Sequence, residues 1–127
     1  MMGAAEVLTI CRRDGTRHVR RGCCFGVRHV SEGFSVGAVH AGHYSAMLPC
    51  DGGYRPTGEW EALSASQREG LWSVGLGDLI VRGEIEGQMD PAQLREAHGS
   101  NAFRVRELIG GEGDGMRMGR YVEVVGG

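Results

Sequence analysis

The chain has 127 residues, 41 % of them hydrophobic and 24 % charged, with a formal net charge of −2. These values predict one globular domain over residues 1–127, and they disfavour a protein built as a whole to attract nucleic acid or an anionic membrane. No run approaches the roughly 18 consecutive apolar residues of a membrane helix, and no export signal is recognisable, so we expect a cytoplasmic protein that contacts no membrane.

Glycine is the unusual component. The chain contains 23 glycines, severalfold more than the usual ~7 %. They separate short apolar runs and show no triplet period. This distribution predicts many tight turns between short strands.

The first half of the chain reads as extended segments. Glu6 to Arg12 alternates and is rich in β-branched residues, and the pair Asp14-Gly15 predicts a hairpin turn after it. Residues 18–30 continue as a strand, with Gly22 and Gly26 as bends or bulges. Two more strands are predicted over 33–41 and 43–49, and residues 50–59 form a loop.

The second half adds short helices. Residues 59–66 suit one or two helical turns, 71–74 a strand, 75–78 a turn, and 79–85 the clearest strand of the sequence.

A capped helix follows this strand. Asp90 is its N-cap, Pro91 its first residue, Gln93 closes a capping box and Gly99 ends it.

The last strands, 102–109 and 116–125, flank a glycine-rich tip. Strands at about ten-residue spacing with one or two short helices predict a mainly β protein, a small antiparallel β-barrel or sandwich. A parallel sheet would need crossover helices that the sequence does not provide.

The Gly75-Leu76-Gly77-Asp78 stretch could be a phosphate-binding loop or a turn. A phosphate loop must open onto a helix, whereas this one opens onto Leu79-Ile80-Val81, and Asp78 places a negative charge where the anion would lie. The turn interpretation is favoured.

Metal and nucleophile patterns are weak. His40 and His43 bracket Gly42 in β-type sequence, where residues three apart point to opposite faces. Cys23 and Cys24 face opposite ways for the same reason, and Asp51 beside Cys50 raises the pKa of that thiol. We therefore predict no catalytic residues, no metal and no cofactor, although the cysteines and histidines could still converge in space as a metal hydrolase site.

The strongest charge feature is the segment Arg12 to Arg21, with five arginines and one acid. It is either a solvated hairpin whose charges blunt an edge strand, or a surface for an acidic partner or a phosphate backbone. Acids follow later in the chain, and opposite patches on one small protein suit head-to-tail self-association. The candidate interaction residues are Arg12, Arg13, Arg17, Arg20, Arg21, Glu112 and Asp114.

The order of Trp72, Gly77-Asp78, Ile80-Val81 and Gly83, then a short helix and a closing hairpin, resembles small structural proteins of tailed phages and prophages. These are proteins of the minor-capsid or head–tail joining (head-closure) type. The resemblance covers the second half of the chain well and the first half loosely. It implies a small β-barrel without catalysis that acts by assembly. The acidic 110–115 tip departs from the polar, often basic tip expected there.

Two main hypotheses follow. The first is a non-enzymatic virion structural protein, assembled in the bacterial host cytoplasm, that binds copies of itself and partners on the portal or tail side. The second is a small nucleic-acid-binding barrel that uses the Arg12–Arg21 hairpin, ranked lower because few aromatic residues are available for base stacking.

Overall fold

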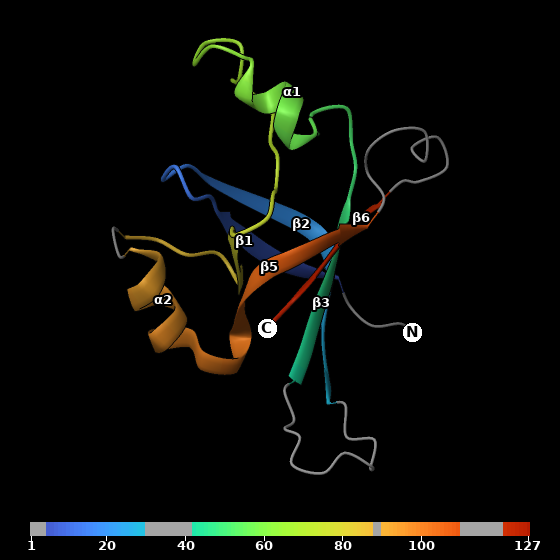
Figure 1. Ribbon diagram of the computed structural model, residues 1–127, viewed down its shortest axis with the longest axis vertical. Coiled ribbons are helices and arrows are strands. Elements are labelled where there is room, and N and C mark those ends of the chain that lie inside the picture. Colours follow the sequence, from blue (N-terminus) through green and yellow to red (C-terminus); the bar gives the residue numbers. More distant parts are fainter. Residues whose placement is uncertain (1–4, 30–41, 88–89, 110–120) are drawn as a thin grey trace.

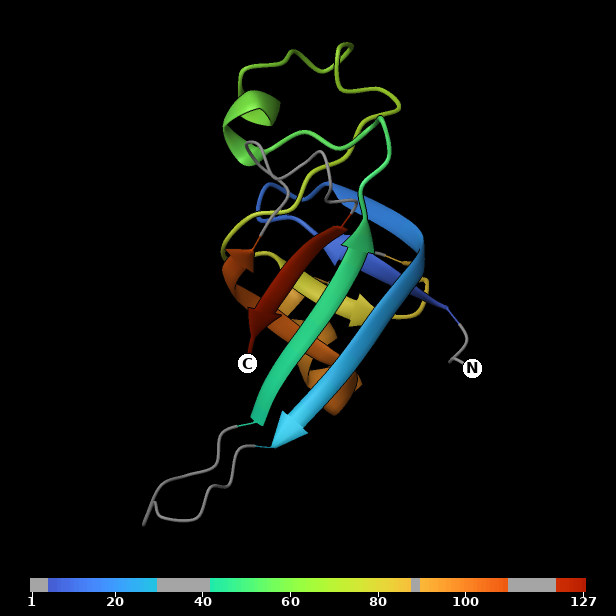
Figure 2. The ribbon, with the colours of Figure 1, turned by 90° about the vertical axis from the view of Figure 1, so that its right-hand side faces the viewer.

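A computed structural model describes residues 5–29, 42–87, 90–109 and 121–127. Six antiparallel strands form a closed barrel in the order β1-β2-β3-β6-β5-β4 (Figures 1 and 2). Their bounds are β1 Glu6–Cys11, β2 Arg17–His29, β3 Gly42–Pro49, β4 Leu79–Arg82, β5 Ala102–Ile109 and β6 Tyr121–Gly126. The helices are α1 Thr57–Glu61 and α2 Pro91–His98, followed by a 3-10 turn, Gly99–Asn101. The prediction of a small antiparallel barrel with short helices is confirmed.

The β1–β2 hairpin forms at the predicted turn. The Gly15 amide donates to the Arg12 carbonyl, and the positive φ of Gly15, 96°, suits a residue without Cβ. Gly22, at φ 77°, lies where the β1–β2 register shifts, so the predicted bulge is confirmed there. Gly26 is different, because it pairs with Ser45 in a regular β2–β3 ladder and forms no bulge.

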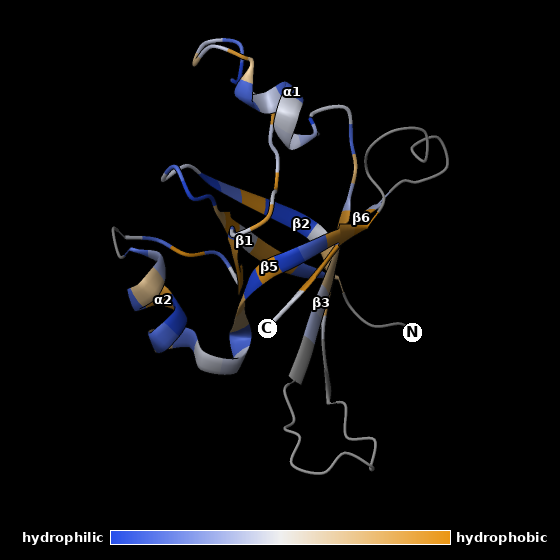
Figure 3. Ribbon diagram, in the orientation of Figure 1, coloured by the Kyte–Doolittle hydropathy of each residue, from blue (hydrophilic) through white to orange (hydrophobic). Residues whose placement is uncertain are grey.

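The barrel interior is filled by alternate residues of all six strands. Leu8, Ile10, Leu48, Phe103 and Val124 are fully buried there. Figure 3 shows hydrophobic residues concentrated in the strands, whereas the β1–β2 turn is hydrophilic. Burial of these side chains, at about 25 cal/mol per Å² of apolar surface, is the main stabilising contribution.

Strand β4 is buried on both faces, which explains its uninterrupted apolar run. Ile80 points into the main core, whereas Leu79 and Val81 pack with Leu94 of α2 in a second cluster. The capping box predicted at Asp90 is present, with both reciprocal hydrogen bonds to Gln93. Helix α2 therefore covers the outside of the barrel at β4.

Three predicted elements differ from the structure. Residues 72–74 are buried and Leu71 is half-buried, but this segment forms only one bridge, Trp72 with Tyr54, because β1 pairs with β4 and closes the barrel without it. Strand β4 ends at Arg82, where Gly83 turns the chain at φ 101°. Helix α1 begins earlier than predicted, after Pro56.

The strand predicted over 33–41 and the start of the one predicted over 116–125 lie outside the described residues. No helix among the described residues is long and apolar enough to cross a membrane.

Candidate functional site

Arg12, the first predicted interaction residue, is buried. Its Nε lies 2.9 Å from Oδ2 of Asp78, and the two side chains are only 7 % and 2 % exposed. The Asp78 carboxylate also accepts the backbone amides of Gly75, at 2.7 Å, and Arg13, at 3.1 Å. The pair therefore joins the loop before β4 to the β1–β2 turn, and Asp78 itself occupies the position that an anion would take in a phosphate loop.

Burial raises the pKa of Asp78 above its ordinary value, although the charge of Arg12 and the two amides act in the opposite direction. Gly77 completes the loop at φ 87°, and a Cβ on it would lie 2.7 Å from Cδ of Arg13. The glycine of this turn is thus required by its backbone conformation and by the arginine that packs across it.

Two further arginines of the segment form exposed ion pairs. Arg20 Nη2 lies 2.6 Å from Asp51 Oδ2, and the guanidinium stacks 4.3 Å from the ring centroid of Trp72. Arg21 Nη2 lies 3.1 Å from Glu84 Oε1. With Arg12, three of the five arginines have a carboxylate partner, so the hairpin carries much less uncompensated positive charge than its sequence suggests.

Arg17 and Arg13 complete the segment. Arg17 donates to the carbonyl of Gly87 at 2.9 Å. The exposed Arg13 side chain lies across Gly77, and no hydrogen bond or ion pair of its guanidinium is found among the described residues. Glu112 and Asp114, the predicted acidic counterpart, lie outside the described residues.

Three of the four thiols have a raised pKa, which makes them poor nucleophiles. Burial raises the pKa of Cys23 to about 11 and that of Cys11 above its ordinary value. Burial and then the neighbouring Asp51 raise the pKa of Cys50, as predicted. Cys23 is buried and Cys24 exposed, which confirms that they face opposite sides of β2.

Within the described part of the chain, no group of three or more His, Cys, Asp or Glu side chains could hold a metal ion. His43 is in β3, and His40 lies outside the described residues.

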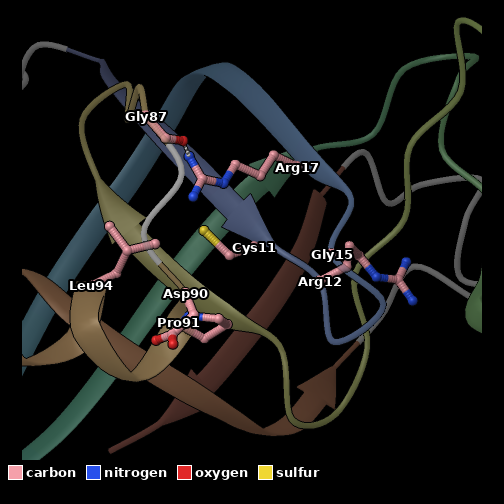
Figure 4. A pocket seen from close by; sticks show the side chains of 8 residues that line it. All are labelled: Cys11, Arg12, Gly15, Arg17, Gly87, Asp90, Pro91 and Leu94. Atoms are coloured by element: carbon pink, nitrogen blue, oxygen red, sulfur yellow. Dashed lines mark hydrogen bonds between the residues drawn. The ribbon is translucent and has the colours of Figure 1, made fainter.

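A cavity of about 480 Å³ lies between the β1–β2 turn and α2 (Figure 4). In Figure 4 the Cys11 sulfur points toward the space between Arg17 and α2, whereas the Arg12 guanidinium points away. Asp90, on the wall, is engaged in capping α2. The lining residues include the Cys11 thiol, whose pKa is raised, and the Asp90 carboxylate, which already accepts a hydrogen bond from the Gln93 amide. These two groups do not form an acid–base pair.

A second cavity, of about 390 Å³, lies on the α1 side of the turn and is lined by Arg12, Arg13, Asp14, Thr57, Trp60, Glu61, Gly75, Leu76 and Asp78. Its wall holds two buried donors, Arg12 Nη1 and Trp60 Nε1, that have no hydrogen-bond partner among the described residues. Trp60 packs edge-on against His18, and burial lowers the pKa of that imidazole to about 4, so His18 is neutral at pH 7.

The feature that sequence reasoning missed is an outer sheet face that no other described element covers. Met47 pairs with Cys24 and Glu123, and Glu123 pairs with Ile109, so these residues form one cross-strand row over β2, β3, β6 and β5, here called the outer row. Met47 and Ile109 are 37 % and 46 % exposed, and Tyr121, two residues before Glu123 on the same face, is 47 % exposed.

In Figure 2, β2, β3 and β6 lie in front and no helix lies between them and the viewer. The alternation of Ala46, Met47 and Leu48 predicts that Met47 points outward, but it does not predict that Met47 is exposed among the described residues.

Searches against protein-family models, curated proteins and solved structures gave no match.

Proposed function

We propose that this protein is a non-enzymatic structural component of a tailed-phage or prophage virion, a minor capsid protein or head–tail adaptor. It would be assembled in the bacterial host cytoplasm and would bind copies of itself and partners on the portal or tail side. The observation that carries the proposal is the outer row with Tyr121, in which the large hydrophobic residues Met47, Ile109 and Tyr121 form an exposed strip around Glu123. Large hydrophobic residues exposed near one another on a small protein are typical of protein–protein contacts.

The sequence resemblance gives the proposal its class of partner. The residues that carry the resemblance stabilise the fold. The Trp72 indole donates a hydrogen bond to Asp51 at 3.0 Å, Asp78 forms an ion pair with Arg12, and Ile80 lies in the core. A protein whose most distinctive residues hold loops in place, beside an exposed apolar strip, is suited to presenting a fixed surface to neighbours.

The test is the association state across a concentration series, measured by sedimentation velocity alone and with a purified portal-type ring. We expect concentration-dependent oligomers or co-sedimentation with the ring. Two variants separate a specific contact from nonspecific association. Met47→Ser, on the strip, should weaken association, whereas Ala62→Ser, on exposed surface elsewhere, should not. A protein that stays monomeric at every concentration and ignores the ring would contradict the proposal.

Nucleic-acid binding through the Arg12–Arg21 hairpin is the alternative, and the carboxylate partners of Arg12, Arg20 and Arg21 weigh against it. It predicts an affinity that falls steeply with salt, in proportion to the phosphates neutralised. Fluorescence anisotropy with a labelled duplex at two salt concentrations tests it, and steeply salt-dependent binding would favour this alternative.

A further inference from the structure

The cavity on the α1 side of the β1–β2 turn has two buried hydrogen-bond donors on its wall. Its volume of about 390 Å³ lies within the range of ligand pockets in proteins. Arg12 Nη1 and Trp60 Nε1 have no hydrogen-bond partner among the described residues. Because a buried N–H group without an acceptor is unfavourable, a ligand that brings an acceptor oxygen into the cavity is stabilised there.

The two donors are held in fixed positions close to each other. The Arg12 side chain is 7 % exposed and forms its ion pair with Asp78, and Trp60 is 2 % exposed and accepts a hydrogen bond from Arg68 at its carbonyl. The guanidinium carbon of Arg12 lies 5.6 Å from the ring centroid of Trp60. Arg12 also lines the cavity beside α2, and in Figure 4 its guanidinium points away from that one. Both donors are therefore placed to bind one small group without rearrangement.

The charges on the same wall disfavour a fully charged ligand. Two guanidinium groups and three carboxylates line the cavity, and they belong to Arg12, Arg13, Asp14, Glu61 and Asp78. The ion pair compensates Arg12 and Asp78, which leaves two carboxylates against one guanidinium. An anion is repelled by these carboxylates, whereas a cation gives no acceptor to the buried donors. A neutral group that both accepts and donates hydrogen bonds fits the wall best.

An amide is a neutral group of this kind. Its oxygen has two lone pairs for the two donors, and its nitrogen carries N–H groups for carboxylate acceptors. Oδ1 of Asp14 accepts the Thr16 amide and leaves Oδ2, and the Glu61 carboxylate has no hydrogen bond or ion pair among the described residues. Leu76, 57 % exposed, lines the same cavity and offers apolar surface to the carbon chain that bears the amide.

We infer that this cavity binds a neutral amide group of a polypeptide. The amide oxygen accepts from Arg12 and Trp60, and the N–H donates to Glu61. A primary carboxamide, as in an asparagine or glutamine side chain, places its second N–H on Asp14, whereas a peptide bond has only the first. The cavity includes no residue of the outer row, so the inference does not depend on the proposed assembly function.

The indole N–H signals in a proton–nitrogen NMR spectrum of the full chain test the inference directly. The chain has two tryptophans, and the indole of Trp72 already donates to Asp51, so its signal is an internal reference. Acetamide should shift the Trp60 signal along a saturating curve and leave the Trp72 signal in place, whereas sodium acetate should not. Binding of N-methylacetamide as tight as that of acetamide points to a peptide bond as the natural ligand, and binding of acetamide alone points to a side-chain carboxamide.

Three results of this titration overturn the inference. If neither amide gives a saturating shift of the Trp60 signal, the two donors bind only water. If acetate binds as tightly as acetamide, the cavity is an anion site. If both indole signals move together, acetamide acts on the solvent and occupies no site. None of these results bears on assembly, which the sedimentation experiment tests separately.

A matched pair of variants tests the role of the carboxylates. Glu61 and Glu59 are both exposed residues of α1, but only Glu61 lines the cavity. Glu61→Ala removes one hydrogen-bond acceptor, so acetamide should bind about two- to tenfold more weakly. The same change removes a negative charge, so binding of acetate should become tighter. Glu59→Ala should change neither affinity. Equal acetamide affinities in the two variants would overturn the assignment of the cavity to an amide.

Discussion

Two aspartates tie loops to arginines of the β1–β2 hairpin, and they differ in burial more than in chemistry. Asp78 forms an ion pair with Arg12 and accepts hydrogen bonds from two backbone amides, with its side chain 2 % exposed. Asp51 accepts from Arg20, from the Gly53 amide and from the Trp72 indole, with its side chain 55 % exposed. Each carboxylate therefore has an arginine and two other groups as partners, but only Asp78 is shielded from water.

The difference shows in the direction of the two pKa shifts. Burial raises the pKa of both carboxylates, but at Asp51 the hydrogen bonds from Trp72 and Gly53 and the Arg20 partner prevail and lower it. At Asp78 burial prevails and the pKa is raised. Similar sets of partners thus lower the pKa of an exposed carboxylate, whereas they do not offset the effect of burial on the pKa of a buried one.

The largest effect is expected from Asp78→Asn. The substitution keeps the shape of the side chain but puts an NH2 group in place of one carboxylate oxygen, so that a buried donor, the Gly75 amide or the Arg12 guanidinium, loses its acceptor, a situation that costs about 1–3 kcal/mol. We expect the free energy of unfolding, measured by urea denaturation, to fall by that amount. A loss below about 1 kcal/mol would mean that water reaches Arg12 and that the pair is not truly buried.

Asp51→Asn is the matched, smaller change. Its partner Arg20 is left near the surface, where water replaces the lost interaction, so a loss of about 1 kcal/mol is expected in the same assay. The asparagine carbonyl can still accept the Trp72 indole hydrogen. If this variant lost as much stability as Asp78→Asn, burial would not be the variable that distinguishes the two sites.

The comparison also marks what the sequence could predict. The turn at Asp14-Gly15, the capping box at Asp90 and the turn character of Gly75–Asp78 depend on neighbouring residues, and local patterns were sufficient for them. Partners such as Arg12 and Asp78 lie in different loops far apart in the chain, and only barrel closure brings them together. The arginine segment was therefore predicted as one charged surface although its members have separate partners.

The same limit explains the errors in extended segments. Trp72, Ser73 and Val74 are buried like a strand, but burial in a small core does not require that a residue pairs in a β-ladder. The outward position of Met47 follows from alternation, whereas its exposure depends on α2 packing at β4 and not at β3, which is a tertiary outcome. Sequence periodicity assigns a face, and only the fold decides whether that face is covered.

Carboxyl titration followed by NMR should place the two aspartates on opposite sides of the ordinary pKa. The contribution of Asp51 to stability is present above the unfolded-state pKa and is lost as pH falls through its lower folded pKa. For Asp78, with a raised folded pKa, the contribution is present at low pH and is lost as pH rises through that value. Asp78 should thus take up its proton first on acidification, and the reverse order would show that the Arg12 charge outweighs burial.

Salt provides the smallest and most selective test of the comparison. Salt ions screen the Arg20–Asp51 ion pair, which is open to solvent, much more than the buried Arg12–Asp78 ion pair. The Debye length falls from about 10 Å at 0.1 M salt to about 3 Å at 1 M, so the screening of the exposed pair is stronger at 1 M. The stability difference between the parent and Asp51→Asn should therefore shrink in 1 M sodium chloride, while that between the parent and Asp78→Asn stays constant. Comparing each variant with the parent at the same salt cancels the general effect of salt on hydrophobic burial. Equal shrinkage of both differences would mean that solvent ions reach the two carboxylates alike, and the contrast in burial would then have no energetic consequence.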